Sequence, residues 1–95
     1  MQKLTEEQID KHLEQIPGWD HYDDAIHTTF EFDNFMDCFS VMTRVAMEAE
    51  KMEHHPDWHN TYATLEISLS THDAGGLTEK DFKLAAAIEH IVGDE

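Results

Sequence analysis

The chain has 95 residues, 40% of them hydrophobic and 28% charged, which is typical of one small globular domain (residues 1–95) and excludes a disordered chain. Its formal charge of −15, from 21 acidic against 6 basic residues, argues against binding to nucleic acid or to an anionic membrane, since both would repel it. No apolar run approaches the roughly 18 residues that span a bilayer, the first residues do not resemble a signal peptide, and a lone cysteine, Cys38, excludes an internal disulfide, so we expect a cytoplasmic protein.

The first predicted element is a helix that begins at Thr5 and is stopped by Pro17-Gly18. Thr5 and Gln8 have the spacing of a capping box, which satisfies free N–H groups at a helix start. The apolar positions that follow recur at helical spacing: Ile9, Leu13 and Ile16. A weak strand over 19–22 is then predicted to pair across Asp23-Asp24 with a second strand over 26–32. In that second strand we expect one side to face the core, namely Ile26, Thr28, Phe30 and Phe32.

The longest helix is predicted from Phe35 to Met52, with Asp33 or Asn34 as its cap. We expect one broad apolar face made of Phe35, Phe39, Met42, Val45, Ala46, Ala49 and Met52. Three further apolar residues lie outside that stripe: Met36, Cys38 and Val41. A helix that is apolar on more than one side packs against more than its own core. It is therefore either a subunit interface or a helix enclosed within its own domain.

The second half of the chain predicts a short extended piece at 56–59, a turn at Asn60-Thr61, a strand over 62–71 and a third helix from about Thr78 to Gly93. In the strand, Ala63, Leu65, Ile67 and Leu69 are expected to face the core. In the helix, Leu84, Ala85, Ile88, Ile91 and Val92 form the expected buried face. The resulting order, α-β-β-α-β-β-α, favours an α+β fold in which helices cover one face of an antiparallel sheet.

Eight histidines are many for a chain of this length, and two of them stand together where the long helix ends. Pro56 biases His55 away from helical geometry, so the chain is expected to leave the helix there. Glu50 lies four residues before His54, so its carboxylate is expected to reach that imidazole. A third histidine, His72, ends a strand.

Other side chains complete this candidate site. Asp81 opens the third helix, and the glycines of the loop before it permit a ligand to approach closely. Trp58 and Tyr62 are candidates for the flat walls of a pocket that binds a ring. A strand end, a helix end and a helix start are therefore predicted to converge on one pocket.

Each of these residues also has an ordinary structural interpretation. His54-His55-Pro56 can be a turn that ends a helix, Trp58 can belong to the core, and Asp81 can stand in a first helical turn because of the helix dipole. A zinc site formed by His55 with His59, or by His54 with His72, is the chemical rival, although no paired-cysteine or His-Glu-x-x-His motif supports it.

The spacing of these residues resembles the pterin-4a-carbinolamine dehydratases, also called the dimerisation-cofactor family. The resemblance covers about residues 26–91 and rests on Glu50, His54-His55-Pro56, Tyr62, His72 and Asp81, with supporting segments at 42–46, 69–72 and 76–78. It implies a four-stranded antiparallel sheet with three helices. It also implies dehydration of a 4a-hydroxytetrahydropterin to a quinonoid dihydropterin, which changes no oxidation state and needs no cofactor and no metal.

The same resemblance implies roles for single residues. His54, His55 and His72 match the three active-site histidines, of which the first and third do acid–base work and the second contacts substrate. Glu50 and Asp81 match acidic positions that orient the histidines, and Pro56 and Trp58 match the segment that shapes the pocket. His59 and Ala63 depart from the family pattern, which we expect to affect substrate preference and not the reaction.

The resemblance also implies partners. Family members form dimers through their sheets and tetramers through the long helix, so we expect a homodimer or homotetramer that uses a sheet edge and helix 35–52. The substrate is what aromatic amino acid hydroxylases release, which predicts a functional link to such an enzyme. The alternative from another class is a protein-binding module that stabilises a partner's oligomer and carries a vestigial site.

Overall fold

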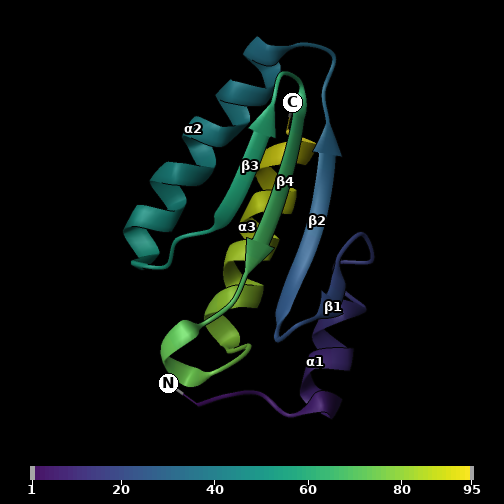
Figure 1. Ribbon diagram of the computed structural model, residues 1–95, viewed down its shortest axis with the longest axis vertical. Coiled ribbons are helices and arrows are strands. Elements are labelled where there is room, and N and C mark those ends of the chain that lie inside the picture. Colours follow the sequence, from purple (N-terminus) through teal and green to yellow (C-terminus); the bar gives the residue numbers. More distant parts are fainter. Residues whose placement is uncertain (1, 95) are drawn as a thin grey trace.

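The computed structural model describes residues 2–94 and contains three α-helices and four strands. The helices are α1 (Glu6–Leu13), α2 (Phe35–Met52) and α3 (Glu79–Gly93), and a 3-10 turn, η1 (His72–Ala74), lies before α3. The strands are β1 (Asp20–Tyr22), β2 (Ala25–Glu31), β3 (Asp57–Thr61) and β4 (Thr64–Leu69). They form one antiparallel sheet in the order β1-β2-β4-β3 (Figure 1), which confirms the predicted α+β fold and element order. Within residues 2–94, no helix combines the length and the apolarity needed to cross a bilayer.

One face of the sheet carries the core. In β4, Leu65, Ile67 and Leu69 are at most 1% exposed, whereas Glu66 between them is exposed, as the alternation predicted. All three helices add buried side chains to the same hydrophobic cluster, among them Ile9, Val45 and Ile88. The helices therefore cover one face, and the opposite face of β2 and β4 presents partly or fully exposed polar side chains.

The apolar face of α2 differs from the prediction. The buried residues are Cys38, Val41, Val45 and Ala49, so two residues placed outside the stripe belong to the core. Phe35 and Phe39, which were expected in the buried stripe, are 45% and 53% exposed. Both sets recur at helical spacing, so periodicity alone cannot choose between them. Packing against the sheet selects the buried set: Cys38 faces β3, and its sulfur accepts a hydrogen bond from Asn60 at 3.3 Å.

The turn between β3 and β4 lies later than predicted, at Tyr62-Ala63 and not at Asn60-Thr61. Asn60 stays in β3 because its side-chain amide donates to the carbonyls of Tyr62 and Thr64 at 3.0 and 2.9 Å. The left-handed backbone that the turn requires falls on Tyr62, with φ of 51°. The strand predicted over 62–71 is accordingly shorter, and α1 also ends early, at Leu13, although Ile16 is still buried.

Candidate active site

The end of α2 redirects the chain so that two histidines leave the helix axis. Glu53 adopts left-handed backbone with φ of 52°, its N–H bonds to the carbonyls of Ala49 and Glu50, and the N–H of His54 bonds to the carbonyl of Ala49 at 3.0 Å. This is a Schellman motif, which usually uses glycine at the left-handed residue. Pro56 then leads into β3. The motif places the His54 side chain in a largely buried setting, 10% exposed, while the adjacent His55 side chain is 62% exposed.

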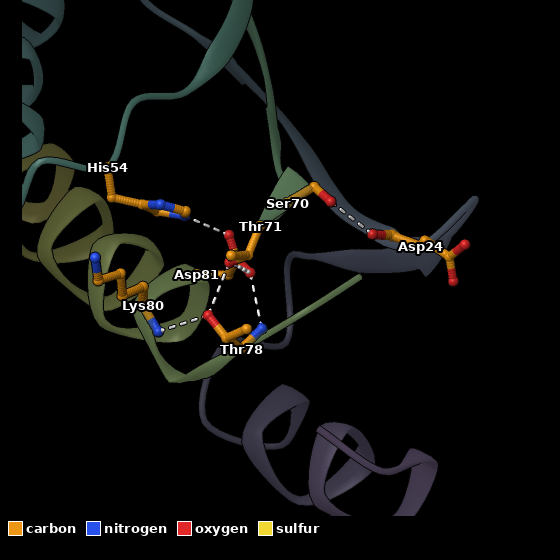
Figure 2. Close-up of polar contacts among 7 residues, drawn as sticks. All are labelled: Asp24, His54, Ser70, Thr71, Thr78, Lys80 and Asp81. Atoms are coloured by element: carbon orange, nitrogen blue, oxygen red, sulfur yellow. Dashed lines mark hydrogen bonds and ion pairs between the residues drawn. The ribbon is translucent and has the colours of Figure 1, made fainter. Parts of the chain in front are cut away.

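His54 contacts the start of α3. Its Nε2 lies 2.6 Å from Oδ1 of Asp81, whose side chain is fully buried (Figure 2). Asp81 is the third residue of α3, and its carboxylate also accepts the backbone N–H of Thr78 at 2.9 Å, as part of a capping box. A carboxylate only accepts hydrogen bonds, so Nε2 of His54 carries the hydrogen. The other ring nitrogen, Nδ1, makes no hydrogen bond with residues 2–94 and is the atom that can exchange a proton with a ligand.

Glu50 does not reach the histidine that the helical spacing suggested. Its Oε1 lies 2.8 Å from Nε2 of His55, so the expected Glu50–His54 contact is wrong. The left-handed turn at Glu53 carries His54 away from the last turn of α2 and toward α3, and this leaves His55 beside Glu50. Both members of the Glu50–His55 pair are exposed, so solvent screens their interaction.

The three histidines line one cavity of about 420 Å³. His72 enters it from η1, directly after the segment that leaves β4. The lining comes from three parts of the chain: residues 53–55, residues 70–74 and Lys80. The convergence of a helix end, a strand end and a helix start therefore holds in the structure.

Other residues of the predicted site lie elsewhere. Trp58 is partly buried and packs against the hydrophobic core, and neither it nor Pro56 is among the residues that line the cavity. Tyr62 is 66% exposed at the β3–β4 turn, at the opposite end of the sheet from η1 (Figure 1). The rings of Trp58 and Tyr62 thus do not form walls of this cavity. Trp58 instead packs from β3 against the core, which was its structural interpretation.

Thr71 and Thr78 both bond to Asp81, and the backbone N–H of Lys80 bonds to Thr78 (Figure 2). Thr78 was expected at the start of the third helix, but none of these three residues was predicted to belong to the site. The hydroxyl of Thr71 donates to Oδ2 of Asp81 at 2.8 Å, and the hydroxyls of Thr71 and Thr78 are 2.7 Å apart. Thr78 and Asp81 have the Thr-x-x-Asp spacing of a capping box, a signal that could have identified Thr78. Thr71 carries no comparable local signal.

The arrangement suits proton transfer. Histidine is the side chain that exchanges a proton near neutral pH, and a general acid or base must lie within hydrogen-bond reach of the group it serves. His54 and His72 both line the cavity, and the ring of His72 makes no hydrogen bond with residues 2–94. Across the same residues, no three His, Cys, Asp or Glu side chains are grouped so as to hold a metal ion.

Comparison with known proteins relates the whole chain to one family. A family model described as "Pterin 4 alpha carbinolamine dehydratase" matches residues 2–91. A protein of Christiangramia forsetii, provisionally named pterin-4-alpha-carbinolamine dehydratase, is 59% identical over 97% of this chain and 95% of its own length. A relative with the same provisional name from Rhizobium johnstonii is 46% identical, over 94% of this chain and 90% of its own.

Solved structures agree with the fold. A crystal structure from Brucella melitensis, described as a transcriptional coactivator/pterin dehydratase, superimposes with a TM-score of 0.93 at 38% identity and covers 96% of this chain and 99% of its own. A pterin dehydratase-like protein described as a RuBisCO assembly factor in the alpha-carboxysome has a TM-score of 0.67 at 17% identity, over 79% of this chain and 87% of its own. At that identity the second likeness concerns the fold alone.

Proposed function

The chain belongs to the pterin 4 alpha carbinolamine dehydratase family, and from that premise we propose that it removes water from a 4a-hydroxytetrahydropterin and releases a quinonoid dihydropterin. The observation that carries the proposal is the presence of His54, His55 and His72 around one cavity. An enzyme of this kind is a hydro-lyase. In recycling tetrahydrobiopterin it would act after an aromatic amino acid hydroxylase, which supplies the carbinolamine.

The reaction balances with imidazoles alone. The bond between C4a and the hydroxyl oxygen breaks, and an imidazolium gives that oxygen a proton so that it leaves as water. A neutral imidazole takes the proton of a ring N–H, and the electron pair of that bond forms the new C=N bond. No electrons pass to an acceptor, so the step needs no redox cofactor.

We assign the acid–base work to His54 and His72 and the substrate contact to His55. His54 has its Nε2 engaged by Asp81, so it would exchange protons through Nδ1. Asp81 orients His54, and Glu50 orients His55. Pro56 and Trp58 shape the pocket indirectly, because Pro56 follows the histidine pair into β3 and Trp58 packs that strand against the core.

A dehydration assay tests the proposal. Synthetic 4a-hydroxytetrahydropterin is mixed with wild type, His54→Ala or His72→Ala, and quinonoid product is followed against the spontaneous rate. Because a positioned general acid or base contributes roughly 10²–10⁴-fold, each variant should lose about that factor in kcat. His21→Ala, on β1 and outside the cavity lining, is the matched control and should keep full activity. A wild-type rate equal to the spontaneous rate would remove the enzyme assignment.

Association is a second part of the proposal. We propose a homodimer or homotetramer that uses a sheet edge and α2, because α2 exposes a row of large apolar side chains: Phe35 at 45%, Met36 at 76%, Phe39 at 53% and Met47 at 64%. The same row is what favours the alternative function, a module that stabilises another protein's oligomer. If wild type has dehydratase activity, and His54→Ala loses that activity while it still associates, the enzyme is distinguished from that module.

We propose a cytoplasmic location, since the lone cysteine is a free, buried thiol.

A further inference from the structure

We propose that Thr71 is a positioning residue for proton transfer, acting through Asp81 on His54. The inference rests on the proposed dehydratase function for its kinetic consequence, although the hydrogen-bond chain behind it can be tested without any substrate. The starting observation is that Asp81, a fully buried carboxylate, is held by three donors from three elements. The loop after β4 supplies Thr71, the start of α3 supplies the N–H of Thr78, and the end of α2 supplies His54.

Counting donors fixes the direction of each hydrogen bond in this series of side chains. The single hydroxyl hydrogen of Thr71 is donated to Oδ2 of Asp81 at 2.8 Å. The contact of 2.7 Å between the hydroxyls of Thr71 and Thr78 must then use the hydrogen of Thr78. Thr78 Oγ1 in turn accepts the backbone N–H of Lys80 at 3.3 Å. The series of hydrogen bonds runs from Lys80 through Thr78 and Thr71 and ends on the carboxylate, so each donor points toward Asp81 (Figure 2).

This polarity matters for His54. Two donors on Oδ2 fix the carboxylate plane and leave Oδ1 directed at the imidazole, where the contact is 2.6 Å. With its Oδ2 held, the Asp81 side chain keeps the ring of His54 in one orientation and keeps the hydrogen on Nε2, which leaves Nδ1 for the substrate. Without Thr71 only the backbone N–H of Thr78 would hold Oδ2. The carboxylate would then gain rotational freedom, and His54 would spend less time correctly oriented.

Thr71 is a better test than Thr78, because Thr78 also caps α3 and its loss would damage the helix. Thr71 contributes to the local structure through its backbone, which forms a β-bridge to Gly76 with an N–H···O bond of 2.9 Å. A change of its side chain leaves that bridge in place. Thr71→Val has nearly the shape of threonine and removes only the hydroxyl, while Thr71→Ser keeps the hydroxyl and removes only a methyl group.

Two measurements on Thr71→Val test the proposal. By NMR, the Nε2–H hydrogen of His54, assigned by its loss in His54→Ala, should be sharp in wild type and broadened in the variant by faster exchange with water. In the dehydration assay kcat should fall about tenfold, part of what a general acid or base contributes, with KM unchanged. Thr71→Ser should restore both, and Thr29→Val on the exposed side of β2 should change neither. Thr71→Ala is measured alongside in case valine prevents folding.

The outcomes separate the two proposals. A wild-type resonance and a wild-type kcat in Thr71→Val would overturn the positioning role. A raised KM with normal kcat would overturn it as well, since it would make Thr71 a substrate contact within the cavity lining. If wild type shows no dehydration while the resonance still broadens in Thr71→Val and recovers in Thr71→Ser, the proposed function fails and the positioning of His54 stands.

Discussion

At the scale of single residues, His54 and His55 are neighbours in the chain with opposite surroundings. His54 is 10% exposed and contacts a fully buried carboxylate, whereas His55 is 62% exposed and contacts a carboxylate that is 81% exposed. Exposed ion pairs contribute only about 0–1 kcal/mol because water and salt screen them. A hydrogen bond to a buried charge is not screened in this way, and the charge is costly to leave without donors. Orientation by Asp81 is therefore the stronger constraint on the site.

Cys38 is a second residue whose behaviour follows from burial. It is fully buried between α2 and β3, and desolvation raises the pKa of its thiol above the ordinary value of 9.0. Since only the thiolate reacts with disulfide reagents, Ellman's reagent at pH 8 should label native protein far more slowly than protein unfolded in urea. Labelling at the same rate in both states would contradict this burial.

The same shift links Cys38 to stability. The folded state holds the thiol proton more tightly than the unfolded chain does, so the stability from this group is fully present below about pH 9. It is lost as the pH rises through the pKa of the folded state. The free energy of unfolding of wild type should therefore decline more steeply above pH 9 than that of Cys38→Ala, in urea titrations at matched pH values.

At the scale of elements, the β1–β2 hairpin carries a removable strain. Its two central residues, Asp23 and Asp24, have φ of 53° and 59°, the left-handed values of a type I′ turn. Glycine adopts that backbone at the second position without strain, so Asp24→Gly should raise the free energy of unfolding by a few tenths to about 1 kcal/mol. Asp33→Gly is the control, because it removes the same charge at a residue whose φ is not positive. This variant should not be more stable than wild type. Equal effects of the two changes would attribute the gain to charge.

Local signals predicted most of the elements. The Asn34 cap, the span of α2 and the alternation of β4 each depend on residues a few positions apart, and all three match the structure. The buried face of α2 did not follow from its pattern, because two apolar stripes compete and only packing against β3 selects one. The β3–β4 turn was misplaced for a related reason, since asparagine favours turns locally but Asn60 is used here to bond across the hairpin.

At the scale of the whole molecule, the site is assembled from contacts between distant segments. His54 and Asp81 are 27 positions apart, and no helix or strand periodicity connects them. The sequence could suggest that a helix end and a helix start meet, but the choice of Glu50 as partner of His54 used a helical rule beyond the point where the helix ends. Residues such as Thr71, whose role depends on a fully formed neighbourhood, become recognisable only in the folded chain.

The last prediction concerns association through α2. Phe39 is 53% exposed at the middle of the apolar row defined above. Burying the exposed half of Phe39 in each of two paired copies removes about as much apolar surface as fully burying one phenylalanine, which contributes about 1.5–3 kcal/mol. If copies pair through this row, Phe39→Gln should weaken association by roughly 10–100-fold, because each 1.4 kcal/mol is a factor of ten. Light scattering coupled to size exclusion would show a smaller mass at equal concentration, while Gln15→Ala, an exposed change just after α1, should leave the mass unchanged.

Salt provides an independent test of the same interface. Every copy carries a formal charge of −15, so association must overcome repulsion, and salt screens charges over about 8 Å at physiological ionic strength. Contact between apolar side chains is not weakened by this screening, so raising the salt concentration should strengthen association of wild type. Association held together mainly by ion pairs would weaken instead. That result, or a Phe39→Gln variant with the mass of wild type at every salt concentration, would show that the exposed row of α2 does not join the subunits.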